Sequence, residues 1–319
     1  MDDLTDRLRV AVIGAGAIAW DVYLPELARR TDVDLVAVVA RSHETIERAQ
    51  SAFGIPAGFR SVDALLGSTA FDLALVLTPP DAHHDQVVQL LEAGRDVLCE
   101  KPVAHTLSDI RAMQEAQRRS GRVLLIAFNR RYCPAYVKAK AALEGRPLHS
   151  CYVEKCKESN QPRALLNDAI HVVDTMRWFC GGVVQDVHAA AVCDDRHQEL
   201  SITASVHFST GRNGQLSMNR AAGSWVERLR SHGSQQTIEV DYPEHVTITK
   251  DGAAMRWSAT AASWGVSSTA ERLGFAGLLD HFIECSAGRQ VPQTPVSDAL
   301  LTHELVDAIY RSAGLPPHD

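Results

Sequence analysis

The 319-residue sequence has few of the features that mark metal, disulfide, nucleic-acid or membrane proteins. Its seven cysteines include no C-x-x-C pair, so we expect free thiols rather than a zinc site or a disulfide framework. Lys and Arg number 32 against 39 Asp and Glu, and this formal charge of −7 argues against nucleic-acid or anionic-membrane partners. The longest apolar run, around Leu73–Leu77, is far shorter than the ~20 residues that span a bilayer.

Motifs of several enzyme classes are absent as well. The 14 histidines show no H-E-x-x-H motif and no cluster at ligand spacing, so we expect no metal site. The lack of a G-x-S-x-G motif argues against a serine hydrolase. The acidic, polar start Met-Asp-Asp-Leu-Thr-Asp-Arg is unlike a signal peptide, and together with the irregular cysteine spacing it predicts a cytoplasmic protein.

Residues 10–19 contain an apolar strand that runs into a glycine-rich turn. Gly14, Gly16 and Ala19 supply the G-x-G-x-x-G/A pattern, in which the first glycine permits the turn and the second lets the backbone approach a pyrophosphate. A helical pattern follows, and a second apolar run, Val33–Ala40, completes a βαβ unit. We therefore predict a dinucleotide site at the start of the first helix, in preference to a purely structural turn.

Residues 8–127 alternate strands with helices, which is typical of a parallel, doubly wound sheet. The predicted strands are Arg9–Ile13, Leu35–Ala40, Leu73–Leu77, Asp96–Cys99 and Val123–Ala127. The predicted helices are Ala17–Arg30, Ser42–Phe53, Ser61–Leu66, Asp81–Ala93 and Leu107–Ser120. Asp81 and Ser108 are predicted as N-terminal caps. Residues 1–127 are thus expected to form an α/β, NAD(P)-binding Rossmann domain.

The pattern changes after Phe128, and residues 128–319 are expected to form an α+β domain on an open, mostly antiparallel sheet. Leu200–Phe208 alternates apolar and polar residues, as a half-covered strand does. The other predicted strands are His149–Lys155, Val184–Val192, Gly214–Arg220, Leu229–His232, Thr237–Asp241 and His245–Lys250. The predicted helices are Pro134–Leu143, Ala164–Phe179, Leu273–Ala287 and Val296–Ser312. Because one broad face of such a sheet needs covering, we expect a homodimer or homotetramer formed through it.

The end of the second predicted strand indicates which cofactor binds. An acidic residue there would bind the adenosine ribose 2′-hydroxyl, whereas an arginine accommodates a 2′-phosphate. This sequence has Arg41 followed by Ser42, with no carboxylate before Glu44. Arg41 can pair with the phosphate and Ser42 can donate a hydrogen bond to it, so NADP(H) is favoured over NAD(H). The alternative is a solvated arginine that begins a helix.

Two loops follow the third and fourth predicted strands, at the sheet edge where ligands of open α/β sheets bind. The first begins with Thr78 and Pro79 and contains His83, and the second is Glu100-Lys101-Pro102. A lysine beside a nicotinamide can move a proton or polarise a carbonyl. By spacing alone, Lys101 is equally compatible with a surface lysine.

The same loops carry a resemblance to the glucose–fructose oxidoreductase, inositol dehydrogenase and rhizopine-catabolism (Gfo/Idh/MocA) family. The resemblance extends over nearly the whole chain and is nearest to the MviM-like branch of that family. The matching stretches are Gly14–Ala19, Thr78–His83, Ala93–Pro102, Phe128–Tyr132 and His171–Phe179. Features shared with the branch are Asn129–Arg131, Arg220–Ser224, Gly274-Phe275 and Pro292–Thr294.

The resemblance implies a catalytic lysine in the Glu-Lys-Pro motif and an Asp-x-x-x-His pair in the second domain. Lys101 and His171 match those positions, but Asn167 stands where the aspartate is expected, with Asp168 next to it. On one continuous helix, Asn167 would lie about 40° around the axis from His171, and Asp168 and Asp174 about 60° to either side. Which of these side chains orients His171 is left open, and a lone histidine there could also be structural.

The residues expected to form the site fall into three groups. The expected catalytic residues are Lys101, His171, Asn167 and Asp168. The expected cofactor-binding residues are Gly14, Gly16, Ala17, Ile18, Arg41, Ser42, Thr78, Pro79, His83, Glu100, Lys101 and Asn129. The expected substrate-binding residues are Lys101, Arg131, Tyr132, Lys155 and His171.

We therefore expect an NADP(H)-dependent oxidoreductase that transfers a hydride between the nicotinamide and a hydroxyl or carbonyl carbon. The resemblance implies a sugar, a cyclitol or a related small molecule as the substrate. Reduction of a C=N bond or of a biosynthetic intermediate is the alternative within the same fold, and Asn167 is compatible with it. A non-catalytic nucleotide-binding sensor or regulatory protein is the alternative from another class.

Overall fold

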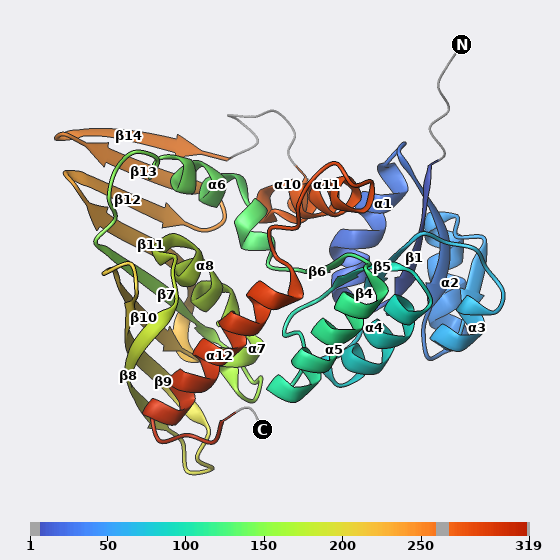
Figure 1. Ribbon diagram of the computed structural model, residues 1–319, viewed down its shortest axis with the longest axis horizontal. Helices are drawn as coiled ribbons and strands as arrows, with labels where there is room; N and C mark the ends of the chain where they lie inside the picture. The colour runs from blue at the N-terminus through green and yellow to red at the C-terminus, as the bar shows by residue number, and fades with distance from the viewer. Residues whose placement is uncertain (1–6, 260–267, 318–319) are drawn as a thin grey trace. The chain divides into compact units, whose positions relative to one another are not determined.

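The computed structural model describes residues 7–259 and 268–317, and the chain divides into two compact units (Figure 1). One unit comprises Met1–Ala127 and Phe275–Ala299, and the other Phe128–Gly274 and Leu300–Asp319. The predicted boundary after Ala127 coincides with this division, but Phe275–Ala299 belong to the first unit and not to the second. Thr294 is one of the residues that join this segment to the first unit: its carbonyl accepts from the Ile126 amide at 2.9 Å, and its hydroxyl donates to the Ile126 carbonyl at 2.7 Å.

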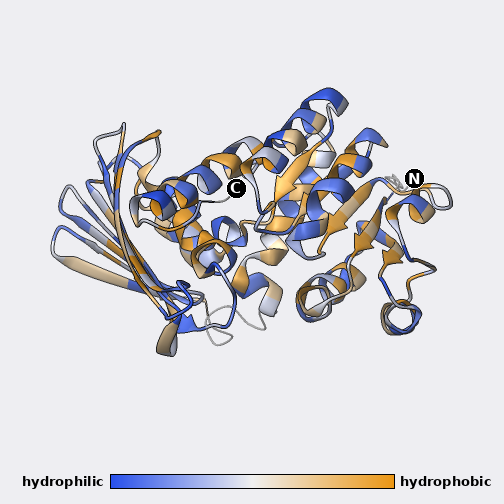
Figure 2. Cartoon of the chain, turned by 90° about the horizontal axis from the view of Figure 1, so that it is seen from below, coloured by the Kyte–Doolittle hydropathy of each residue, from blue (hydrophilic) through white to orange (hydrophobic). Residues whose placement is uncertain are grey.

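The first unit contains a parallel six-stranded sheet with the order β3-β2-β1-β4-β5-β6. Its strands are β1 (Leu8–Ile13), β2 (Val33–Val39), β3 (Ala57–Phe59), β4 (Leu73–Val76), β5 (Asp96–Cys99) and β6 (Leu124–Ile126). Apolar residues are concentrated in these strands (Figure 2), and β4 and β5 are buried along their whole length. The Rossmann-type sheet is thereby confirmed. Because all six strands run in one direction, the loops that follow β1, β4 and β5 emerge at one sheet edge.

The helices of the first unit follow the predicted order, with differences at their starts. They are α1 (Leu24–Arg29), α2 (His43–Phe53), α3 (Val62–Leu66), α4 (His83–Glu92), α5 (Leu107–Ser120) and α11 (Phe275–Ser286). Both predicted caps are wrong: Thr106 caps α5 in place of Ser108, and Asp81 lies in a 3₁₀ turn, η2 (Pro80–Ala82), ahead of α4. The first helix begins at Ala17 as predicted and continues to Arg29, but Ala19–Tyr23 form a wider π-helical turn, η1, before α1.

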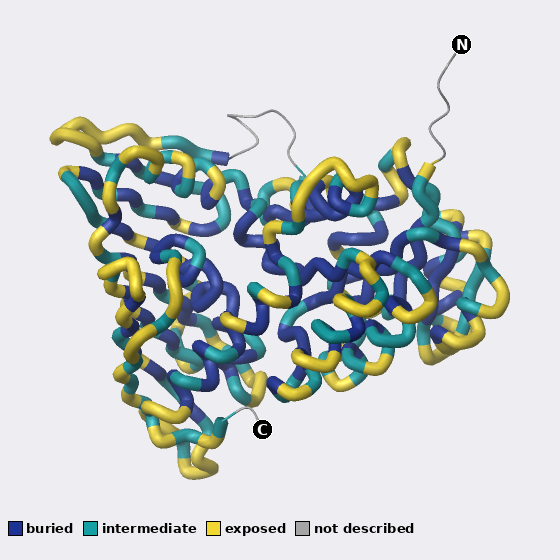
Figure 3. Tube along the Cα trace, viewed as in Figure 1, coloured by how far each residue is buried: buried dark blue, intermediate teal, exposed yellow. Residues whose placement is uncertain are grey.

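The second unit is built on an eight-stranded sheet with the order β14-β13-β12-β11-β7-β10-β9-β8. Its strands are β7 (Ser150–Glu158), β8 (Val184–Cys193), β9 (Glu199–Phe208), β10 (Asn213–Asn219), β11 (Ala221–Gly233), β12 (Gln236–Asp241), β13 (His245–Lys250) and β14 (Ala253–Ser258). Strands β7 and β10 pair in parallel, and the other pairs given for the described residues are antiparallel. This confirms the predicted mostly antiparallel sheet. β14 is an exposed edge strand (Figure 3).

Helices cover one face of this second sheet. They are α6 (Pro134–Ala141), α7 (Ala164–Asn167), α8 (Ile170–Cys180), α10 (Thr269–Leu273) and α12 (Val296–Ser312, from Leu300 on), with a 3₁₀ turn, η3 (Asn129–Tyr132). Helix α8 packs on β7 and β10, and all of its residues except Trp178 are buried. No helix in the part of the chain that the structure describes is both long and apolar enough to cross a membrane.

Candidate functional site

Gly14, the first glycine of the predicted phosphate-binding turn, adopts a backbone conformation that favours glycine. Its φ is +97°, and its amide donates a hydrogen bond to the Val39 carbonyl at 2.8 Å. A Cβ atom at this position would lie 2.9 Å from the backbone of Leu77 and Thr78. Glycine therefore lets the turn after β1 pass against the loop after β4.

A cavity of about 400 Å³ opens beside this turn. It is lined by Ala15, Gly16, Ala17, Trp20, Glu44, Thr45 and Arg48. A Cβ on Gly16 would meet nothing within 4 Å, so the space outside the turn is free for a ligand. Ile18 stands at the N-cap of η1, and the Arg48 guanidinium lies 4.1 Å from the centre of the Trp20 ring. The open backbone turn and its small residues fit the pyrophosphate of a dinucleotide.

A second arginine accompanies Arg41 at the end of β2. Arg60 follows β3, which pairs in parallel with β2, and its Nε donates a hydrogen bond to the Arg41 carbonyl at 3.2 Å. Both arginines are exposed. Ser42 caps α2, because its Oγ accepts from the Thr45 amide at 3.2 Å and donates to Thr45 Oγ1 at 2.8 Å. Sequence analysis missed Arg60 because the three residues of β3 are too few to give a recognisable period.

His83 supports the two loops that follow β4 and β5 from inside. Its Nδ1 lies 3.1 Å from the carbonyl oxygens of Pro102 and Val103, and its Nε2 lies 2.7 Å from the Thr78 carbonyl. The ring is fully buried, and burial lowers the pKa of His83. Both ring nitrogens thus lie against backbone oxygens of the two loops, which gives His83 a supporting role, and its predicted contact with the cofactor stays a prediction. Pro79, by contrast, is exposed.

Lys101 follows β5, at the same sheet edge as the phosphate-binding turn. Its side chain is half-buried, and its backbone amide donates to Glu100 Oε2 at 3.0 Å. Glu100 is itself buried, and its Oε1 accepts a hydrogen bond from the Tyr23 hydroxyl at 2.8 Å. Tyr23 gave no sequence signal, because its contact with Glu100 joins residues 77 positions apart.

In the second unit, His171 lies in the first turn of α8. Its side chain is buried, and its ring packs edge-on against Phe128 with 6.4 Å between the ring centres. The predicted continuous helix over Ala164–Phe179 is wrong, because α7 ends at Asn167 and α8 begins at Ile170. The angles expected from one regular helix therefore do not describe this segment.

Asn167 and Asp168, at the end of α7 and just after it, each form a polar interaction with another part of the second unit. The Asn167 side-chain amide donates to the Pro162 carbonyl at 2.6 Å. Asp168 forms an ion pair with Lys157 of β7 at 2.8 Å. Asn167 thus acts as a hydrogen-bond donor, a role that the aspartate of the family pattern could not take.

Asp174 is held by a buried arginine. Arg131 donates to both of its carboxylate oxygens, at 2.8 Å from Nε and 2.5 Å from Nη2, and Thr302 donates to Oδ1 at 3.1 Å. Asp174 is fully buried and the Arg131 side chain is only 6% exposed. Asp174 is thus the counter-charge of Arg131, and the predicted contact of Arg131 with the substrate stays a prediction.

Glu227 joins two more buried cations. Arg130 donates to both of its oxygens, at 2.8 and 2.9 Å, and Lys155 Nζ lies 2.6 Å from Oε2. Burial alone would raise the pKa of Glu227, but the charges of Arg130 and Lys155 outweigh it and lower the pKa to about 2. Lys155, predicted to bind substrate, is thus part of an internal charge cluster.

Asn129 also lies inside the second unit. Its amide donates to the Leu273 carbonyl at 2.8 Å, and its Oδ1 accepts from Arg130 at 3.0 Å. The residue is fully buried and has a structural role in these bonds, and its predicted contact with the cofactor stays a prediction. Tyr132 is half-buried and continues to be a candidate for substrate contact.

Comparisons with known proteins agree with this architecture. Residues 8–128 match the GFO_IDH_MocA family, described as an oxidoreductase family with an NAD-binding Rossmann fold, and residues 134–251 match the YceM-like C-terminal domain. The protein YceM of Salmonella typhimurium is 29% identical over 314 residues, which cover 96% of this chain and 98% of YceM. A D-apiose dehydrogenase of Paraburkholderia graminis is 26% identical over 336 residues, with 96% and 88% covered.

A solved structure has the same fold over nearly the whole chain. The dehydrogenase MviM of Clostridium difficile gives a TM-score of 0.86 at 22% identity, covering 96% of this chain and 99% of that one. The two sheets fit these similarities. The chain is therefore a member of the Gfo/Idh/MocA family of NAD-binding oxidoreductases.

Proposed function

We propose that the protein is an NADP(H)-dependent oxidoreductase that interconverts a hydroxyl and a carbonyl group on a sugar, cyclitol or related polyhydroxylated compound. One observation supports this most. The turn at Gly14–Ala17, the loop at Thr78 and the loop at Lys101 follow the adjacent strands β1, β4 and β5 of one parallel sheet. A phosphate-binding turn and a half-buried lysine thus share the edge where such sheets bind ligands.

The bound cofactor supplies the hydride acceptor or donor at its nicotinamide C4. In the direction of oxidation, the substrate carbon loses a hydride and its hydroxyl loses a proton, which leaves a C=O bond. We assign the proton to Lys101 Nζ, which accepts it when neutral and returns it in the direction of reduction. His171 is proposed as the second acid–base group.

The substrate class rests on the family and on a relative. A D-apiose dehydrogenase, whose name specifies a sugar, matches 96% of this chain. Reduction of a C=N bond is the second candidate, and the specific observation in its favour is Asn167. This side chain donates to a loop carbonyl and carries no charge, so it cannot stabilise an imidazolium as the family aspartate would. NADPH formation from NADP⁺ with a panel of sugars and cyclitols, compared with NADPH consumption with a panel of imines, separates the two candidates.

The preference for NADP(H) is assigned to Arg41 and Arg60. Alanine at either position is expected to weaken NADPH binding about tenfold or more, because a hydrogen bond to a charged phosphate contributes about 1.5–3 kcal/mol. NADH affinity is expected to stay within about twofold, since NADH lacks that phosphate. Titration of nicotinamide fluorescence measures both affinities. Arg118→Ala is the control, because this exposed arginine of α5 pairs with Glu115. Equal affinities of the unaltered protein for NADPH and NADH would refute the assignment.

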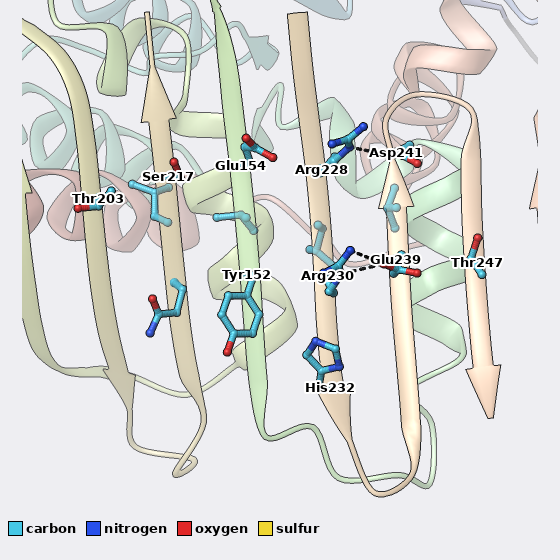
Figure 4. A pocket seen from close by; sticks show the side chains of 15 residues that line it. Tyr152, Glu154, Thr203, Ser217, Arg228, Arg230, His232, Glu239, Asp241 and Thr247 are labelled. Carbon is cyan, nitrogen blue, oxygen red and sulfur yellow. Dashed lines mark hydrogen bonds and ion pairs between the residues drawn. The ribbon is translucent and has the colours of Figure 1, made fainter. Parts of the chain in front are cut away.

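We also propose that two copies associate through the outer face of the second sheet. A hollow of about 720 Å³ lies on this face, and Figure 4 shows Tyr152 there beside Arg228, Arg230 and their partners Asp241 and Glu239. Tyr152 is 45% exposed. A face that carries both charge signs and an exposed aromatic ring can be self-complementary across a two-fold axis.

Tyr152→Glu is expected to dissociate this dimer, because it replaces an exposed aromatic ring of this face with a charge that association would have to remove from water. Sedimentation velocity at micromolar concentration measures the change in mass. Val137→Glu is the matched control, since Val137 is 48% exposed on α6, away from this face. A monomeric wild-type protein under the same conditions would contradict the dimer.

A further inference from the structure

The turn that follows the phosphate-binding glycines is wider than an α-helical one. Residues Ala19–Tyr23 form the π-helical turn η1, and the Leu24 amide donates to the Ala19 carbonyl, five residues back. Such turns are rare, and they occur frequently at functional sites because they change the direction of the side chains that they carry. Here the last residue of the wide turn is Tyr23.

Tyr23 connects this turn to the loop that carries Lys101. Its hydroxyl donates to Glu100 Oε1 at 2.8 Å, and Glu100 Oε2 accepts from the Lys101 backbone amide at 3.0 Å. Tyr23 is fully buried and Glu100 is 9% exposed, so water does not compete freely for these bonds. The carboxylate is therefore held at both oxygens, one by η1 and one by the amide of Lys101 itself.

The tyrosine is itself fixed and stays a donor. Its ring packs edge-on against Phe275, with 5.3 Å between the ring centres. Burial, and then the adjacent Glu100 carboxylate, raise the pKa of Tyr23 well above its usual value. The hydroxyl proton is therefore present over the whole pH range in which an oxidoreductase is assayed, and it can only be donated to Glu100.

We propose that Tyr23 is a positioning residue for Lys101: by holding one oxygen of Glu100, it fixes the carboxylate that holds the Lys101 backbone. This inference rests on the proposed function in one respect, namely that Lys101 acts in the reaction. Through two hydrogen bonds, Glu100 connects Tyr23, in the turn next to the proposed phosphate site, with the backbone of Lys101, the proposed proton acceptor. The phenyl ring alone would suffice for packing; the hydroxyl is needed only for the positioning.

The test is Tyr23→Phe, which keeps the ring and removes the hydroxyl. Hydrogen exchange of the peptide that contains the Lys101 amide, followed by mass spectrometry, is expected to accelerate about tenfold, with the rest of the first sheet unchanged. This readout needs no substrate. Once a substrate is known, kcat is expected to fall about tenfold while KM for substrate and cofactor changes less than about twofold.

Tyr310→Phe is the matched control. Tyr310 is a buried tyrosine that also donates to a glutamate, Glu199, at 2.9 Å, but it lies in the second unit. It is expected to leave both the Lys101 exchange rate and kcat unchanged. Glu100→Ala, which removes both acceptor oxygens, tests the connection: if Tyr23 acts through Glu100, adding Tyr23→Phe to it is expected to cost much less than Tyr23→Phe alone.

Three results would overturn the proposal. They are unchanged exchange of the Lys101 peptide in Tyr23→Phe, acceleration spread evenly over the first unit, and effects of Tyr23→Phe and Glu100→Ala that simply add. A wild-type protein with no turnover on any substrate would count against the proposed function, whereas the exchange measurement would still decide whether Tyr23 fixes the loop.

Discussion

Lys101→Ala is expected to lower turnover by about 10²- to 10⁴-fold, the range that follows loss of a positioned acid–base group. Affinity for NADP(H) is expected to change little, because the phosphates are assigned to the turn around Gly16 and to Arg41. Steady-state kinetics and fluorescence titration on the same preparation measure the two quantities. A loss of the same order is expected for His171→Ala.

Lys101→Arg sharpens this prediction. Arginine keeps the positive charge but does not give up its proton in proteins, so it cannot accept the hydroxyl proton of a substrate. The variant is therefore expected to be nearly as inactive as Lys101→Ala. Lys250→Ala, at an exposed position on β13, is the control and is expected to retain full activity. Full turnover in Lys101→Ala would remove the mechanism and favour a nucleotide-binding sensor.

Glu227→Gln is expected to destabilise the second unit by about 3–5 kcal/mol, because it leaves the buried charges of Arg130 and Lys155 without their counter-charge. Chemical denaturation followed by circular dichroism measures the loss. Glu239→Gln is the matched control, since Glu239 pairs with Arg230 on the surface, where both side chains are at least 39% exposed. Its effect is expected to be within about 1 kcal/mol.

The same cluster predicts a dependence on pH. The pKa of Glu227 in the folded protein is about 2, below its ordinary value of 4.5. A depressed pKa means that the contribution of Glu227 is complete above pH 4.5 and is lost as the pH falls from there toward 2. In Glu227→Gln this part of the acid sensitivity is expected to be absent. A wild-type protein and a variant of equal stability at pH 7 would contradict the assigned role.

The sequence predicts elements well where local patterns determine them. Asp96–Cys99, Leu107–Ser120, His245–Lys250 and Val296–Ser312 are predicted to the residue, because hydrophobic period and turn residues agree there. Short or exposed elements are not predicted in this way. β3 has three residues, and four of the six residues of the edge strand β14 are exposed, so neither shows a period.

The site is predicted less completely than the fold. Local motifs identify Gly14, Gly16 and Lys101, because their chemistry is contained in a few consecutive residues. The pairing of Arg131 with Asp174 joins residues 43 positions apart, and that of Lys155 with Glu227 joins residues 72 apart. From the sequence, Arg131 and Lys155 are therefore predicted to contact the substrate, although each forms a buried ion pair in the folded protein. The roles of Tyr23 and Arg60 depend on contacts with Glu100 and Arg41 that form only in the folded sheet.

The most direct test of the central claim follows nicotinamide absorbance with purified protein. NADP⁺ is supplied with a panel of sugars and cyclitols, and NADPH with the corresponding carbonyl compounds, each with the wild type and Lys101→Ala in parallel. The wild type is expected to turn over at least one compound, faster with NADP(H) than with NAD(H), and the variant is expected to be slower by at least about 10²-fold. Tight binding of the cofactor without turnover of any compound in either direction, or equal rates in the two proteins, would contradict this claim.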